Sequence, residues 1–91
     1  MEYPVLDPKA TGARIRELRK EKNIKVGEIR EFMGFENDQS IYKWQRGDCL
    51  PTVDNLYALS KLFDTTIEDI LQGSKEDNSP PFPFYENKLA G

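Results

Sequence analysis

The feature that most constrains the fold is the stretch 38–47, in which two large apolar residues have helical spacing. Ile41 and Trp44 stand three positions apart, so a helix places both on one face, which can turn toward a core. Gly47 closes this helix, because glycine accepts the left-handed backbone that ends many helices. The outward side chains are polar and long: Asp38, Gln39, Tyr42 and Lys43.

Such an outward face has two interpretations. A short helix that presents donors and acceptors fits the major groove of duplex DNA, where base edges carry a distinct hydrogen-bonding pattern. The same face also suits an ordinary solvated surface helix. The stretch alone leaves both interpretations open.

Length and composition indicate one small globular domain. The chain has 91 residues, of which 37% are hydrophobic and 32% charged, as expected of a single compact core. No apolar run reaches the roughly 18 residues of a membrane-spanning helix, so no membrane association is expected. Cys49 is the single cysteine and cannot form an intramolecular disulfide, and no charged-then-apolar leader is present. Both features favour a reducing, cytoplasmic setting.

Charge is unevenly distributed along the chain. The net charge of −3 argues against an indiscriminate nucleic-acid binder. From Lys9 to Lys25, however, seven basic residues stand against two acidic ones, a local balance of +5. Beyond residue 50, seven acidic residues stand against three basic ones, a local balance of −4. A basic end can therefore meet phosphate although the whole chain is acidic.

The first 22 residues predict an extended arm followed by a helix. Pro4 and Pro8 interrupt residues 1–10, which indicates an arm without regular helix. Thr11 is the expected N-cap of a helix that runs to about Lys22. Asn23 suits the left-handed turn that ends it.

Four further helices are expected, which makes the fold class all-α with five helices in residues 11–72. Their signals are a stretch 26–33 ended by Gly34, the stretch 38–47, a stretch 53–63 capped by Thr52, and a short helix capped by Thr66. The second and third helices with their short connection form a helix-turn-helix arrangement. The predicted core consists of Ile15, Leu18, Ile24, Ile29, Phe32, Phe35, Ile41, Trp44, Leu50, Leu56, Leu59, Phe63, Ile67 and Ile70.

Residues 73–91 differ in composition from the domain. A polar linker precedes the segment 80–85, which combines proline with three aromatic residues. This linker and Pro/aromatic tail is expected either to move freely or to dock on its own domain, on a second subunit or on another protein.

The linked signals resemble a known family. They are Arg14-Ile15-Arg16-Glu17-Leu18-Arg19, Ile24, Ile29, Gly34, Ile41-x-x-Trp44-Gln45-Arg46-Gly47, Leu50-Pro51-Thr52, Leu56, Leu59 and Ile67-Glu68-Asp69-Ile70-Leu71. This order is similar to that of the lambda-repressor-like, Cro/cI/Xre-type helix-turn-helix transcriptional regulators, over residues 11–72. The resemblance implies a compact five-helix domain that binds double-stranded DNA, as a homodimer on a pseudo-palindromic operator, with its third helix in the major groove.

The resemblance also implies contact residues. Base readout falls on Asp38, Gln39 and Lys43, with Ser40 and Tyr42 at the flanks. Gln39 suits bidentate pairing with adenine, and Lys43 suits guanine or a nearby phosphate. Asp38 either accepts from a cytosine amine or caps the third helix, and the N-cap role is favoured. The expected phosphate contacts are Arg14, Lys25 and Arg46.

Several positions depart from the family pattern. Val26 replaces a glutamine that commonly holds a phosphate, which leaves Lys25 as the substitute. Gln45 replaces a glutamate that often pairs with the helix-one arginine, here Arg19, and can still hydrogen-bond it. Asp48 replaces a frequent basic residue.

An enzyme is not expected from this sequence. It has no histidine, no cysteine pair for zinc and no phosphate-cradling glycine loop, so neither a metal nor a cofactor is predicted. The alternative to DNA binding is a protein-interaction module, or an antitoxin that combines both functions, using the acidic C-terminal half and the tail.

Overall fold

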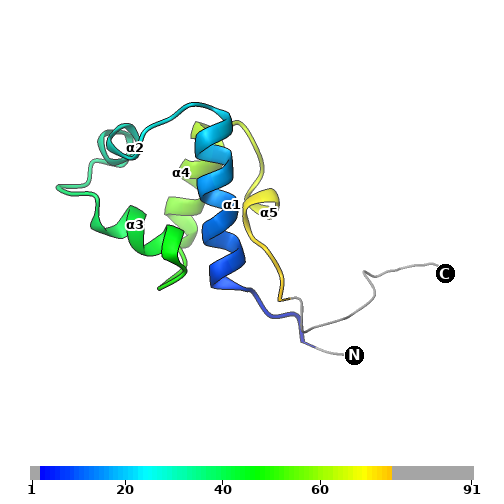
Figure 1. Ribbon diagram of the computed structural model, residues 1–91. Coiled ribbons are helices and arrows are strands. Elements are labelled where there is room, and N and C mark those ends of the chain that lie inside the picture. Colours follow the sequence, from blue (N-terminus) through cyan, green and yellow to red (C-terminus); the bar gives the residue numbers. More distant parts are fainter. Residues whose placement is uncertain (1–2, 75–91) are drawn as a thin grey trace.

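The computed structural model describes residues 3–74, whose regular elements are five α-helices. They are α1 (Pro8–Glu21), α2 (Val26–Met33), α3 (Gln39–Arg46), α4 (Val53–Leu62) and α5 (Ile67–Ile70). Figure 1 shows α1 in the centre, with α2 and α3 on one side of it and α5 on the other. The predicted all-α, five-helix fold is confirmed. None of these helices combines the length and the apolar character that crossing a bilayer requires.

Helix α1 begins four residues earlier than predicted, since the expected N-cap was Thr11. Asp7 is its N-cap, and the Asp7 carboxylate accepts a hydrogen bond from the Ala10 amide at 3.1 Å. Pro8 occupies the first helical position, where no amide hydrogen is needed, so this proline starts the helix instead of excluding it. Thr11 is fully buried inside α1. The predictions of Thr11 as N-cap and of an extended arm through residue 10 were therefore wrong.

The remaining part of the arm is tied to the end of the domain. Leu6 and Gly73 form an antiparallel bridge. The Asp7 amide donates to the Gln72 carbonyl at 2.8 Å, and the Gln72 amide donates to the Thr11 hydroxyl at 3.0 Å. The start and the end of the described chain thus lie together beside α1. The predicted linker and Pro/aromatic tail lie, from residue 75 onward, outside the described residues.

The helix ends agree with the sequence in most places. Asn23, Gly34 and Gly47 have φ values of 58°, 77° and 84°, so all three predicted left-handed stops are confirmed. The Thr66 hydroxyl accepts from the Asp69 amide at 3.0 Å and caps α5 as predicted. Thr52 stands at the predicted N-cap position of α4, but its hydroxyl bonds to the Asp54 carboxylate and makes no capping bond to a helix amide.

One core joins all five helices. Its buried members are Ile15, Leu18, Val26, Ile29, Ile41, Trp44, Leu56, Leu59, Phe63 and Ile70. Trp44 is 4% exposed and packs edge-on against Phe35, with ring centroids 5.9 Å apart. Phe32 is 52% exposed, which contradicts its predicted place in the core. The inward stripe of α2 runs through Val26, Ile29 and Met33 and leaves Phe32 outside it.

Helix α1 packs chiefly against α3, and Gly12 sets the distance between them. A Cβ atom at Gly12 would lie 2.2 Å from the Trp44 carbonyl oxygen and 2.7 Å from that of Gln45. The two backbones can approach this closely only because the residue has no side chain. Sequence periodicity did not single out Gly12, since it depends on which helix crosses α1 there.

We expect Gly12→Ala to destabilise the domain by about 3 kcal/mol, because its methyl group forces the α1 and α3 backbones apart. Gly27→Ala is the matched control: a Cβ there meets only the Arg30 guanidinium, at 3.7 Å. This control should gain about 0.5–1 kcal/mol of stability from helix propensity. Denaturant unfolding followed by circular dichroism measures both changes. Equal effects of the two substitutions would refute the close crossing.

Candidate nucleic-acid interface

Helix α3 separates an apolar inner face from a polar outer face. Ile41 is fully buried and Trp44 is 4% exposed, which confirms the predicted inward orientation of both. The residues on the other side are exposed: Gln39, Ser40, Tyr42, Lys43 and Arg46. The structure therefore brings four of the five predicted base-contacting residues onto one accessible surface, together with Arg46.

The fifth, Asp38, has a different environment. It stands at the N-cap position of α3, but its side chain accepts no hydrogen bond from the helix. The carboxylate instead accepts from the Arg30 guanidinium of α2 at 3.2 Å. The Asn37 side chain takes the capping contact, accepting from the Gln39 amide at 3.0 Å. The predicted cap role of Asp38 was wrong, because Arg30 competes for its carboxylate and makes it a bridge between α2 and α3.

The start of α2 combines an exposed lysine with a buried valine. Lys25 is the N-cap residue, and its amide donates to the Glu28 carboxylate at 2.7 Å. The Lys25 side chain is exposed, and none of the described residues pairs with its ammonium group. Val26, which replaces a family glutamine, is buried in the core. Of these two residues, only Lys25 can therefore meet a phosphate.

Arg46, at the end of α3, already has an acidic partner. Its Nε and Nη2 atoms lie 3.0 and 2.7 Å from one carboxylate oxygen of Asp48. Both side chains are at least half accessible, so this pair contributes little to stability. It does offset the positive charge of Arg46 locally.

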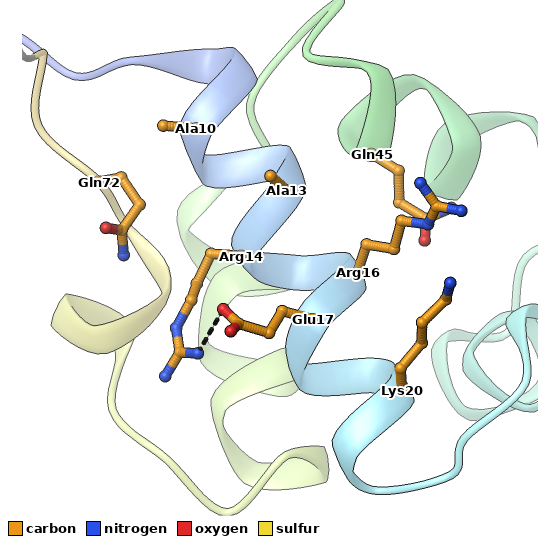
Figure 2. A pocket seen from close by; sticks show the side chains of 8 residues that line it. All are labelled: Ala10, Ala13, Arg14, Arg16, Glu17, Lys20, Gln45 and Gln72. Atoms are coloured by element: carbon orange, nitrogen blue, oxygen red, sulfur yellow. Dashed lines mark hydrogen bonds and ion pairs between the residues drawn. The ribbon is translucent and has the colours of Figure 1, made fainter.

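The cations of α1 point in opposite directions. Figure 2 shows Arg14 turned toward α5 and Gln72, whereas Arg16 and Lys20 extend from the other side of the helix, toward Gln45 of α3. All three line a surface hollow with Gln45, and in this hollow Arg14 is paired with Glu17 whereas Arg16 and Lys20 have no such partner among the described residues. Arg14 was the expected phosphate contact on this helix. Arg16 and Lys20 were not predicted, although their spacing of four residues places them on a shared side.

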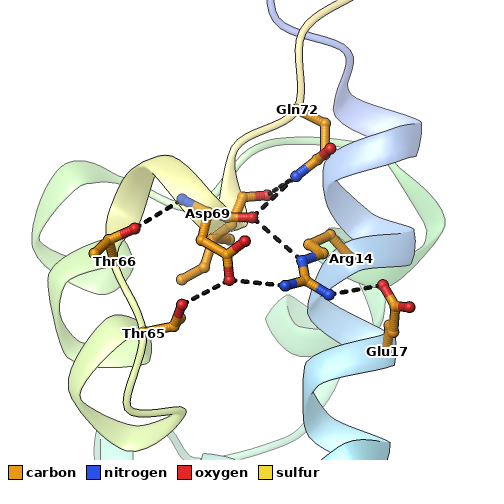
Figure 3. A network of polar contacts seen from close by, with 7 residues as sticks. Arg14, Glu17, Thr65, Thr66, Asp69 and Gln72 are labelled. Atoms are coloured by element: carbon orange, nitrogen blue, oxygen red, sulfur yellow. Dashed lines mark hydrogen bonds and ion pairs between the residues drawn. The ribbon is translucent and has the colours of Figure 1, made fainter.

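Arg14 belongs to an internal polar network (Figure 3). Its Nη2 lies 2.7 Å from the Asp69 carboxylate, its Nε donates to the Asp69 carbonyl at 3.3 Å, and its Nη1 lies 2.8 Å from the Glu17 carboxylate. Thr65 donates to the same Asp69 oxygen at 2.6 Å. The guanidinium thus joins α1 to α5, and this geometry does not support its expected role at phosphate.

The network shifts the titration of both central groups. Hydrogen bonds to Glu17 and then Asp69 raise the pKa of Arg14 above its ordinary value. The Thr65 hydroxyl, followed by the Arg14 guanidinium, holds the pKa of Asp69 below its ordinary value. Both shifts favour the charged forms that the ion pair requires.

Arg19 and Gln45 join α1 to α3. The Arg19 Nε donates to the Gln45 side-chain oxygen at 3.1 Å, which confirms the predicted hydrogen bond. The Arg19 Nη1 donates to the Ile24 carbonyl, also at 3.1 Å. Both acceptors are uncharged, so the positive charge of Arg19 is not cancelled by these contacts.

A helix packed inward by Ile41 and Trp44, with a polar outer face and a second helix just before it, defines the helix-turn-helix class. The chain belongs to the helix-turn-helix family HTH_3, which matches residues 15–70. The resemblance to lambda-repressor-like, Cro/cI/Xre-type transcriptional regulators is confirmed. This is a family of DNA-binding proteins and not of enzymes, in agreement with the sequence prediction.

Solved structures of low sequence identity share the fold. The restriction-modification controller protein C.AhdI from Aeromonas hydrophila has a TM-score of 0.63 and 22% identity, covering 70% of this chain and 96% of that chain. The clp gene regulator ClgR from C. glutamicum has a TM-score of 0.61 and 19% identity, covering 69% and 80%. The DNA-binding domain of BldD from S. venezulae has a TM-score of 0.60 and 21% identity, covering 71% and 96%. No curated protein matches the chain.

The Asp69 network predicts a loss of stability in acid. Because the pKa of Asp69 is lower in the folded state than the unfolded value near 3.9, the unfolded state binds more protons between these two values. The contribution of Asp69 is therefore complete above about pH 4 and is lost as the pH falls through the folded pKa. We expect Asp69→Asn to be less stable than the wild type at neutral pH and to approach it in acid.

Melting temperatures measured from about pH 6 to pH 2.5 test this expectation. Glu68→Gln is the control, since Glu68 is the neighbouring carboxylate and lies outside the network. Parallel curves for the wild type and Asp69→Asn would contradict the assigned role of Asp69.

Proposed function

We propose that this protein is a sequence-specific binder of double-stranded DNA that regulates transcription, as a repressor, with α3 in the major groove. The observation that carries the proposal is the outer face of α3. The side chains of Gln39, Ser40, Tyr42 and Lys43 are exposed, and none forms a hydrogen bond or ion pair with the residues that the structure describes. Their donors and acceptors are therefore available to base edges.

Each residue of this face has a proposed role. Gln39, in the first turn of α3, pairs through its amide with adenine, and Lys43, one turn later, contacts guanine or a nearby phosphate. Ser40 and Tyr42 make flanking contacts. Since Arg30 holds its carboxylate, we assign Asp38 to positioning α3 rather than to reading a base.

The proposed phosphate contacts lie at both ends of the helix-turn-helix. Lys25 precedes α2, and Arg46 ends α3. Arg46 would exchange its exposed partner Asp48 for phosphate on binding. Arg14 is not included, because two carboxylates already hold its guanidinium.

We also propose a homodimer on a pseudo-palindromic operator, in the cytoplasm. Support for subunit contact comes from α4, where Val53 is 77% and Tyr57 is 58% exposed. Four residues apart, they form one apolar strip on the helix surface. The same strip favours the second candidate function, binding of a protein partner, as in an antitoxin.

We expect Gln39→Ala to reduce discrimination between operator and random duplex about tenfold or more, while affinity for random duplex stays nearly constant. Selection of bound duplexes from a random pool supplies the operator, for which a symmetric motif with half-sites about ten base pairs apart is expected. Fluorescence anisotropy at one salt concentration then measures both affinities.

Equal losses on the two duplexes would remove Gln39 from base readout. A wild-type protein that binds neither duplex, or both equally, would refute the proposed function itself. Thermal melting of the variant confirms that α3 remains folded.

A further inference from the structure

The described part of the chain contains five arginines, and their partners divide them into two groups. Arg14, Arg30 and Arg46 each form an ion pair with one or more carboxylates. Arg16 and Arg19 form none. These two unneutralised arginines both lie on α1 on the side of Gln45, as does Lys20, which also has no acidic partner in residues 3–74.

Gln45 explains why this charge persists. A glutamate at this position, as the family pattern has it, would place a carboxylate against Arg19 and beside Arg16 and Lys20. The glutamine keeps the 3.1 Å bond to Arg19 without any negative charge. Because its oxygen faces the Arg19 guanidinium, its amide nitrogen remains as a further donor.

The acidic residues nearest in sequence form no ion pair with Arg16, Arg19 or Lys20. Glu17 is held by Arg14 at 2.8 Å. Glu21 follows Lys20 directly, so its side chain leaves α1 about 100° further round the helix. Arg16 and Lys20, four residues apart, stay on one side of α1 and, with Gln45, line part of a surface hollow that also includes Arg14 and Glu17 (Figure 2).

We propose that Arg16 and Lys20, with Gln45 between α1 and α3, form a phosphate-binding seat for the backbone of duplex DNA. The guanidinium of Arg16 offers a planar pair of donors, Lys20 a point charge, and Gln45 an uncharged donor. The seat rests on the proposed function and adds to it a contact from α1 that tracks the backbone next to the groove occupied by α3. Its ligand is the phosphodiester, so it contributes affinity without sequence preference.

Salt titration of affinity for a random duplex tests the seat. Each phosphate contact contributes about 0.9 to the slope of log affinity against log salt. Losing one contact therefore reduces the ratio of affinities at 50 and 200 mM salt by about 3.5-fold. We expect this reduction for Arg16→Gln and for Lys20→Gln, and about twice the slope change for the double variant.

Lys61→Gln is the control, because it removes the same charge from α4, where Lys61 lies over the Tyr57 ring. Its slope should equal that of the wild type. Arg16→Gln and Lys20→Gln change exposed side chains and should leave the melting temperature nearly unchanged, whereas Lys61→Gln also removes the contact with the Tyr57 ring and should lower it slightly.

Gln45→Glu provides a second test in which stability and affinity move in opposite directions. The new carboxylate forms a charge-assisted bond to Arg19, so the melting temperature should rise. It also neutralises the seat and repels phosphate, so affinity for every duplex should fall, and the ratio of affinities at 50 and 200 mM salt should shrink by about 3.5-fold or more. A purely structural Gln45 would raise or lower stability without changing the salt slope.

The outcomes separate the seat from the proposed function. The seat is refuted and the proposed function stands if Arg16→Gln and Lys20→Gln have the same salt slope as Lys61→Gln while Gln39→Ala still loses discrimination between operator and random duplex. If the wild type shows no salt-dependent binding to any duplex, both are refuted. If Gln45→Glu binds as tightly as the wild type, the electrostatic role assigned to position 45 is wrong.

Discussion

The close crossing of α1 and α3 is the contact on which the rest of the structure depends. At Gly12 the α1 backbone meets the Trp44 carbonyl, and at Gly47 the end of α3 meets the α1 backbone at Lys9. The indole of Trp44 points into the core and packs edge-on against Phe35. Because α3 is held along its inner side in this way, its outward side chains have a defined direction without any contact of their own. A preorganised face loses less conformational entropy when it binds.

Ion pairs in this domain hold elements together and also determine where charge remains. Arg14 with Asp69 joins α1 to α5, and Arg30 with Asp38 joins α2 to α3. Each such pair removes a cation from the surface charge. The side of α1 next to Gln45 has no carboxylate partner among the described residues, so positive charge remains there although the chain has a net charge of −3. An acidic protein can thus present a cationic face.

Local signals predicted much of this fold. The range of α2 and the ends of α1, α2 and α3 follow from apolar spacing and from residues that accept positive φ. The start of α1 was missed because a proline was interpreted as a helix breaker although it stands at the first helical position. The structural roles of Gly12 and Arg14 could not be predicted from local signals. Their roles depend on partners 32 and 55 residues away, Trp44 and Asp69, which only the packed helices bring near.

The sequence predicts the direction of the side chains on the outer face of α3 better than that of the cations of α1. Gln39 and Lys43 follow from one helix whose inner side is marked by Ile41 and Trp44. The separation of Arg14 from Arg16, two residues apart on α1, follows from where α5 and α3 lie. Position 45 links the face of α3 to the cations of α1. A glutamine there preserves the bond between α1 and α3 and leaves the adjacent cations unneutralised. At position 45, the packing of α1 against α3 is therefore separable from the surface charge. A change between glutamine and glutamate alters that charge and keeps the bond between the two helices.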